Sequence, residues 1–335
     1  MPFEENDKVQ NGKSTQHLNV IFINIFKKRE TGVLLAILII GLFFSITTPM
    51  FLELSNLVSI LRQASIIGIM TLSVTFLMIS GEFDLSIGST FANAPVIAVE
   101  LMIKGGYPMG VAFLIGFLVG PVFGFINGMM VTKTKVPSFI ATLGTMMIYR
   151  GTALVISGGW PKSPYVTNIL TLVLGEGKLF NYIPVPALWF VGITIIMWAI
   201  LEKTIFGFKI FATGGNLEAA KLSGIKTDNV KITNFVLTGL FSAFAGLVTL
   251  CYIGQVAPTM GAGYELEAIA STVIGGTALS GGIGSILGAF LGSFILAEIR
   301  NGLVMKMVDP YIHRGVIGAV IIAAAIINIQ VVRKK

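Results

Sequence analysis

Long apolar runs separated by short polar stretches dominate the sequence. A helix needs roughly 20 predominantly apolar residues to cross the hydrocarbon core of a bilayer. Runs of about this length occur at 32–47, 57–79, 86–103, 108–131, 137–157, 183–201, 231–254, 266–280, 285–305 and 311–331. The pattern predicts an all-α, polytopic integral membrane protein with about ten transmembrane helices.

Two of these ten segments have a weaker apolar pattern than the others. The segment 86–103 contains Asn93, Pro95 and Glu100, and the segment 266–280 is short and rich in Gly, Ser and Thr. Irregular backbone at membrane depth is tolerated only where it is buried in protein or lines a cavity. Either segment could therefore be a broken or re-entrant element instead of a full crossing.

Composition supports a lipid environment. Of the 335 residues, 54% are hydrophobic and only 12% are charged, whereas soluble domains carry about 25% charged residues. The 39 glycines suit close packing of helices in membranes. The net charge of +7 comes from basic residues that lie mostly between apolar runs, so it indicates membrane orientation and a lipid bilayer as partner, not nucleic-acid binding.

The basic residues also predict the orientation. Four groups stand out: 27–29, Lys133 with Lys135, five lysines between 203 and 231, and 333–335. Ten alternating crossings from a cytoplasmic N-terminus place all four groups in the cytoplasm, as the positive-inside rule requires. The predicted outer loops hold fewer basic residues, among them Lys104, Lys162, Lys178 and Lys306. We expect a cytoplasmic N-terminal segment (1–31), a transmembrane domain (32–332) with a cytoplasmic loop at 203–230, and a cytoplasmic tail (333–335).

The chain offers few residues for covalent chemistry. Cys251 is the single cysteine, which excludes an internal disulfide and a multi-cysteine metal site. His17 and His313 are the only histidines, too few for a histidine-based metal centre. No G-x-x-x-x-G-K-[ST] phosphate-binding loop occurs. We expect no catalytic residue, metal or cofactor, and hence no enzyme. ATP-driven transport would need ATP and magnesium on a separate ATPase subunit.

The loop 203–230 contains a signal for a short helix. Asn216 is a good N-cap residue, Leu217–Leu222 can form the helix, and Gly224 is a natural C-cap. The small side chains of Ala219 and Ala220 would let another surface approach closely. From the residues alone, an ordinary capped turn is the favoured interpretation.

Several motifs together resemble the permease subunit of bacterial ribose-type (carbohydrate uptake) ABC transporters. Glu218-Ala219-Ala220 followed by Gly224 looks like the E-A-A-x-x-x-G signature of ABC importer permeases. The segment 81–89 is similar to the family's G-G-x-D-L-S-x-G-S, with Glu82 in place of the second Gly. Further matching segments are 142–145, 150–151, 263–270 and 275–277. The resemblance covers roughly residues 55–330.

This resemblance implies a function and partners. The chain would be the translocation subunit of an ATP-driven importer of a sugar or sugar-like solute in the bacterial inner membrane. Its partners would be an ATP-binding subunit, a substrate-binding protein and a second permease copy, identical or related. Docking to the ATPase would involve Asn216, Glu218, Ala219, Ala220 and Gly224. The alternative is an ion-coupled secondary transporter, which would need carboxylates near the membrane midplane; such residues are nearly absent from the predicted spans.

Six polar residues are candidates for the translocation pathway or its gate: Asp84, Ser86, Asn93, Asn127, Ser271 and Asn301. Asp84 lies between two apolar spans, where a buried carboxylate is costly and invites a functional hypothesis. The favoured interpretation is that it caps the following helix. Asn127 and Asn301 each precede Gly within apolar helices, and such amides usually form hydrogen bonds between helices. Contact with sugar hydroxyls is the alternative for both.

Four charged residues have structural interpretations. Arg150 is expected either to extend toward the outer surface or to pair with a carboxylate inside the bundle. Glu265 and Glu267 are expected to be solvated loop charges at the outer mouth, with contact to a periplasmic partner as the alternative. Glu82 is expected to be solvated at the cytoplasmic mouth.

Overall fold

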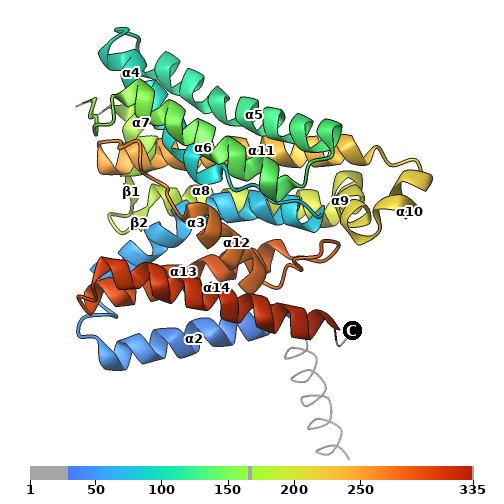
Figure 1. Cartoon of the computed structure of the whole chain (residues 1–335). Coiled ribbons are helices and arrows are strands. Elements are labelled where there is room, and N and C mark those ends of the chain that lie inside the picture. Colours follow the sequence, from blue (N-terminus) through green and yellow to red (C-terminus); the bar gives the residue numbers. More distant parts are fainter. Residues whose placement is uncertain (1–28, 165–167, 334–335) are drawn as a thin grey trace, which may run out of the picture.

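The computed structural model of the chain describes residues 29–164 and 168–333, and it is an almost entirely helical bundle (Figure 1). Within these residues, seven helices are long and apolar enough to cross a membrane. They are α2 (Arg29–Thr47), α3 (Leu54–Ile79), α5 (Met109–Thr134), α6 (Ser138–Ser157), α8 (Val185–Lys203), α11 (Thr227–Ile253) and α13 (Ile286–Met305). The all-α, polytopic prediction is confirmed. Expectations about residues 1–28 and 334–335 lie outside the described residues.

The three remaining expected crossings correspond to α4 (Ile87–Ile103), α12 (Tyr264–Ile274) and α14 (Pro310–Arg333). At 1.5 Å per residue, the 17 residues of α4 extend about 25 Å and the 11 residues of α12 only about 16 Å. The hydrocarbon core is about 30 Å thick. The segment 266–280 is therefore not a helical crossing: helix α12 ends at Ile274, and irregular backbone follows it.

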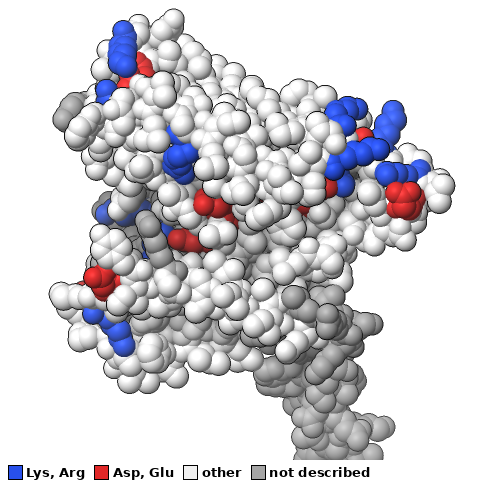
Figure 2. Space-filling model, viewed as in Figure 1, with Lys and Arg blue, Asp and Glu red and all other residues white. Residues whose placement is uncertain are grey.

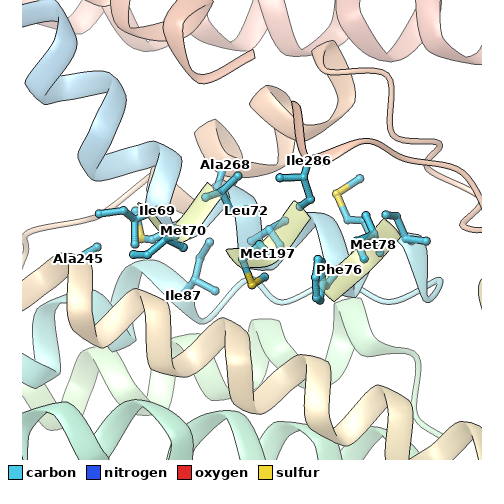
Figure 3. Packing of buried hydrophobic residues seen from close by; sticks show 14 of the residues in the cluster. Ile69, Met70, Leu72, Phe76, Met78, Ile87, Met197, Ala245, Ala268 and Ile286 are labelled. Carbon is cyan, nitrogen blue, oxygen red and sulfur yellow. The ribbon is translucent and has the colours of Figure 1, made fainter. Parts of the chain in front are cut away.

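Helix α3 is the central element of the bundle. Its side chains are buried continuously from Ala64 to Ile79, because α8, α11, α12 and α13 surround it. Figure 3 shows side chains from these helices meeting around α3, with Met197, Ala245, Ala268 and Ile286 among them. A helix that is apolar on all sides is suited to such a position.

Glycines allow the closest helix packing in the bundle. A Cβ atom on Gly120 of α5 would collide with the carbonyl oxygen of Gly239 in α11, and a Cβ atom on Gly239 would collide with the carbonyl oxygen of Gly120. Side chains at either position would force the two helices apart. This contact is the small-residue packing that the glycine content indicated.

The two ends of the bundle differ (Figure 1). One end carries α7 (Ile169–Thr171), a π-helical turn (Leu172–Glu176) and the antiparallel pair β1 (Lys178–Leu179) and β2 (Ile183–Pro184). The opposite end carries α9 (Ile205–Gly215) and α10 (Leu217–Leu222), together with the beginning of α2 and the end of α14. The sequence did not predict α7, the β-hairpin or α9. We call the second end the α10 end.

Candidate functional site

Helix α10 has the capped form that the sequence predicts. The side-chain Oδ1 of Asn216 accepts a hydrogen bond of 3.0 Å from the backbone N–H of Ala219. Gly224 has a φ of +81°, a conformation that glycine adopts readily. The N–H of Ile225 then reaches the carbonyl oxygen of Ala220 at 3.0 Å. Both ends of this short helix are thus fixed by its own sequence.

The two alanines of the signature face in different directions. Ala219 is exposed, whereas Ala220 is only 4% exposed and packs within the chain. The expectation that a partner would cover both alanines is therefore wrong for Ala220. The exposed residues of α10 are Glu218, Ala219, Lys221 and Leu222, and Leu222 is 89% exposed.

The residues just before α10 contact the interior of the bundle through backbone atoms. A Cβ atom on Gly214, in the last turn of α9, would collide with the carbonyl oxygen of Ile79 at the end of α3. The N–H of Gly282, in the loop between α12 and α13, donates a hydrogen bond of 2.8 Å to the same carbonyl. A Cβ atom on Gly282 would lie 2.6 Å from the Cα of Gly215. We call this contact of α3, α9 and the 275–285 loop the glycine junction.

The segment that follows α3 is irregular. Residues 82–84 form no regular secondary structure, and a turn at residues 85 and 86 leads to α4. The N–H of Phe83 donates to the hydroxyl of Ser138, and the N–H of Leu85 donates to the hydroxyl of Thr142, both at 3.1 Å. These hydroxyls belong to the first two turns of α6. They satisfy backbone groups that neither a helix nor lipid could satisfy at this depth.

Asp84 is the centre of a buried polar network. Its Oδ1 accepts hydrogen bonds from the N–H and the hydroxyl of Ser86, at 2.8 and 2.7 Å. The amide of Asn127 in α5 donates to the second carboxylate oxygen at 3.2 Å and to the Ser86 hydroxyl at 2.8 Å. The Tyr149 hydroxyl donates to the Asn127 Oδ1 at 3.2 Å. Asp84 therefore fixes the turn immediately before α4 and connects that turn to α5. The expectation that it caps α4 itself is wrong, because the N-cap is Ser86 and no side chain caps the helix there.

Of the other candidate pathway residues, some lie in or beside the Asp84 network and the others lie elsewhere in the bundle. Asn93 donates to the carbonyl oxygen of Tyr149 at 2.7 Å, which places it beside the Asp84 network. Ser271 is buried in α12, and its hydroxyl has no hydrogen-bond partner among the described residues. Asn301 donates to Asn56 at 2.9 Å and so connects α13 to α3. Four of the six candidates thus lie together, whereas Ser271 and Asn301 lie apart.

A second cluster of polar residues was not expected. Arg150 of α6 donates to the carbonyl oxygens of Pro258 and Met260, at 2.8 and 2.7 Å. Among the described residues it therefore forms no direct ion pair, and backbone carbonyl groups hold its guanidinium instead. Glu267 lies 3.3 Å from Arg300 of α13 and is only 7% exposed, so the expectation of a solvated loop charge is wrong for Glu267.

Glu265 and Tyr264 complete this second cluster. Both lie in the first turn of α12 and are partly buried, and the Arg300 guanidinium lies 5.5 Å from the centroid of the Tyr264 ring. The sequence places carboxylates at the outer mouth because it does not reveal that the 254–263 loop turns back into the bundle. We call Arg150, Tyr264, Glu265, Glu267 and Arg300 the charged cluster.

Glu82 is paired, contrary to expectation. Its carboxylate lies 2.6 Å from the Nζ of Lys231 in α11, and both side chains are mostly buried, at 12% and 15% exposure. The departure from the family pattern at this position thus introduces an ion pair. The pair connects the segment after α3 to α11, close to the glycine junction.

Comparisons with known proteins agree with this architecture. Residues 56–325 match the family described as "Branched-chain amino acid transport system / permease component". The chain is 38% identical over 314 residues to the ribose import permease protein RbsC of Bacillus subtilis, covering 94% of this chain and 96% of that protein. The Escherichia coli K12 RbsC is 35% identical over 303 residues, covering 89% and 92%. The autoinducer 2 import system permease protein LsrC of Photorhabdus luminescens is 33% identical over 306 residues, covering 91% of each chain. No solved structure gives a significant match.

The fold and these matches show that the chain is a multi-pass, helical permease of a membrane transport system. Within that class, the chain belongs to the family of branched-chain amino acid transport system permease components. It resembles ribose import permeases over nearly its whole length.

Proposed function

We propose that this chain is the translocation subunit of an ATP-driven importer in the bacterial inner membrane, with both termini in the cytoplasm. The observation that carries the proposal is the exposed, doubly capped helix α10 at one end of the bundle. The chain has no phosphate-binding loop, so ATP and magnesium would be held by a separate ATP-binding subunit. The exposed Leu222 and Ala219 suit a shallow groove on that subunit.

Charge distribution supports this orientation. The basic residues of the 203–231 region lie at the α10 end (Figure 2). Helix α2 begins and helix α14 ends at the same end of the bundle (Figure 1). At the opposite end, Lys104 and Lys162 lie 2.8 and 3.2 Å from the carboxylate of Glu100. Two of the outer lysines that weaken the positive-inside pattern are therefore ion-paired with a single carboxylate, which leaves a charge of +1 at this place.

The glycine junction supplies a route for energy coupling. Movement of α10 would be passed to Gly214 and Gly215, which end helix α9 and contact the backbone of Ile79 and Gly282. Ile79 is the last residue of α3, directly before the irregular 80–86 segment, and Gly282 lies within the 275–285 loop. A backbone-to-backbone contact has little room to absorb a displacement, so α10 would act directly on both segments.

The solute is proposed to be a sugar or a sugar-like molecule. The relatives are named for ribose import and autoinducer 2 import, and this chain matches them along most of its length. A substrate-binding protein would deliver the solute at the end opposite α10. A second copy of this permease, or a related chain, would complete the pore.

Reconstitution tests the proposal. The permease would be placed in lipid vesicles with its ATP-binding subunit. A substrate-binding protein loaded with ribose would be added, and uptake of ribose into the vesicles would be measured. We expect uptake that requires enclosed or added ATP on the α10 side and that persists when ionophores abolish all ion gradients. The charged cluster offers carboxylates that an ion-coupled secondary transporter could use. Uptake that ionophores abolish and that needs no ATPase would establish this alternative.

A further inference from the structure

A cavity of about 520 Å³ lies between α2, α12, α13 and α14. Residues 32–40 of α2 and 320–328 of α14 supply two of its walls, and Ile295 and Ile299 of α13 supply a third. Helices α2 and α14 run along the same side of the bundle (Figure 1). Pockets that bind small molecules have volumes of roughly 300–1,000 Å³. The cavity is therefore large enough for a ligand, and it is separate from the Asp84 network and from the charged cluster.

The walls of this cavity are apolar. Among the described residues that line it, only Asn328 of α14 has a polar side chain. Its amide donates hydrogen bonds to the carbonyl oxygens of Val273 and Thr277, at 3.3 and 2.9 Å, and so satisfies the backbone where α12 ends. A buried water molecule needs about two to four polar partners. These walls supply too few of them, so the cavity suits an apolar occupant.

The cavity opens at a surface that is apolar. Gly32 and Ala323 line the cavity and are exposed. Neighbouring side chains on both helices are exposed as well, with Ile39 of α2 at 65% and Ile322 of α14 at 62%. Apolar faces of this kind contact the hydrocarbon core when a helix crosses a membrane. The cavity is therefore continuous with the lipid-facing surface of α2 and α14.

The cavity has the length of one membrane leaflet. Residues 32–40 and 320–328 each extend about 12 Å at 1.5 Å per residue, and half of a hydrocarbon core of about 30 Å is about 15 Å. Both stretches lie toward the α10 end of the bundle. Further along α2, Phe44 is buried, and a Cβ atom on Gly302 of α13 would collide with its ring. Direct packing of α2 on α13 thus limits the cavity toward the opposite end.

We propose that one acyl chain of a membrane phospholipid, from the leaflet on the α10 side, occupies this cavity. A hydrocarbon chain is slender and apolar, and it needs no hydrogen-bond partner from these walls. A helix of a second permease copy would contact its neighbour over the full hydrocarbon thickness of about 30 Å, so it does not fit a cavity that spans one leaflet. The inference goes beyond the proposed function, because it needs only the membrane position of these helices.

A chain in the cavity would lie beside the loop that carries the glycine junction. Ile274, the last residue of α12, and Gly276 in the 275–285 loop both line the cavity. At the other end of this loop, the Ser285 hydroxyl donates a hydrogen bond of 2.9 Å to Glu30 in the first turn of α2. A ligand that binds only the folded state stabilises it. We therefore expect added phospholipid to raise the thermal midpoint of the delipidated permease.

Photochemical labelling tests the site in the unsubstituted protein. The permease would be purified from membranes that contain a phospholipid with a diazirine in one acyl chain, in a mild detergent that displaces loosely held lipid. After irradiation, mass spectrometry of peptides should find adducts on residues 32–40 and 320–328. The exposed face of α5 at residues 114–122 is the control and should carry few adducts. Equal labelling of α5 and the cavity walls, or no labelling of either, would overturn the inference.

Filling the cavity tests the same assignment by substitution. Ala36→Phe combined with Ala324→Phe places two rings in the space, and labelling of the walls should fall about tenfold because close-packed interiors leave no room for both occupants. Ala319→Phe is the matched control, because Ala319 is exposed on α14 and does not line the cavity. Its labelling should equal that of the wild type. The filled variant should retain at least the thermal midpoint of the delipidated wild type, and undiminished labelling of such a folded variant would contradict the proposal.

Two further arms distinguish other occupants. In the first, a non-esterified fatty acid with the same diazirine replaces the phospholipid, and we expect it to label the walls less. Labelling by the fatty acid alone would refute the phospholipid. In the second, Ala323→Cys is placed in a Cys251→Ser background and oxidised in membranes, and we expect no disulfide between copies. A disulfide-linked dimer together with unlabelled walls would show that a second copy covers the cavity, against the proposal.

Discussion

The backbone N–H of Gly282 donates a hydrogen bond of 2.8 Å to the carbonyl oxygen of Ile79. This bond joins the end of α3 to the loop after α12, two parts of the chain about 200 residues apart. Gly214 contacts the same carbonyl from α9, immediately before the exposed helix α10. The bond thus lies where the proposed ATPase contact meets the irregular segments of the bundle.

The glycine junction should not tolerate a methyl group. Gly214→Ala places a Cβ atom against the Ile79 carbonyl oxygen, and overpacking of this kind costs about 1–3 kcal/mol. We expect a lower thermal midpoint in detergent and reduced uptake. Gly192→Ala is the matched control, because it also lies within a helix but has open space around it. Equal behaviour of the two variants would contradict the packing argument.

Asp84→Asn should be milder than Asp84→Leu. The amide retains an oxygen that can accept from Ser86, whereas leucine leaves the Ser86 N–H and the Asn127 amide without this acceptor. Each buried group left unpaired costs about 1–3 kcal/mol. The check is the amount of folded protein in membranes and its thermal midpoint, followed by uptake. If both variants fold normally and abolish uptake equally, the charge of Asp84 has a functional role beyond these hydrogen bonds.

Tryptophan at the two alanines of α10 should produce different defects. Ala220 is buried within the chain, so Ala220→Trp should lower the thermal midpoint of the permease alone. Ala219 is exposed, so Ala219→Trp should leave that midpoint unchanged and block association with the ATPase. Fluorescence-detected size exclusion of each variant, with and without the ATPase, separates the two effects. Normal assembly and uptake by Ala219→Trp would exclude this surface from the contact.

The ion pair of Glu82 and Lys231 offers a test of coupling between two residues. Lys231→Met leaves a mostly buried carboxylate without its partner, and breaking such a pair costs about 3–5 kcal/mol. The double variant Glu82→Gln with Lys231→Met removes both charges and should recover much of the lost stability. A double-mutant cycle on the thermal midpoint measures this difference. Simple addition of the two single effects would show that the pair does not contribute as a unit.

Features that depend on local sequence could be predicted. The crossing expected at 137–157 is observed as Ser138–Ser157, because a continuous apolar run is enough to specify it. The helix at Leu217–Leu222 and its cap by Asn216 also follow from neighbouring residues. For Asp84 the local pattern predicted a bond to a following backbone N–H, which is observed at Ser86, but the predicted cap of α4 is wrong, because Ser86 itself is the N-cap.

Features that depend on contacts between distant segments could not be predicted. Burial of Ala220 follows from how α10 lies against α9 and α11, which no local pattern specifies. The inward position of Glu267 requires that the 254–263 loop turn back toward Arg150. The glycine junction likewise joins three segments that are far apart in the sequence. Each segment contains glycine, but its local sequence does not indicate that the three meet.

Site-directed cross-linking tests the central claim, that α10 docks on an ATP-binding subunit, most directly. Cysteine would replace the exposed Ala219 in a Cys251→Ser background, with Lys104→Cys at the opposite end of the bundle as the control. With the co-expressed ATPase subunit in native membranes, we expect a cross-link from residue 219 and none from residue 104. Absence of any cross-link from residues 216 to 224, in membranes where the transporter is active, would contradict the account.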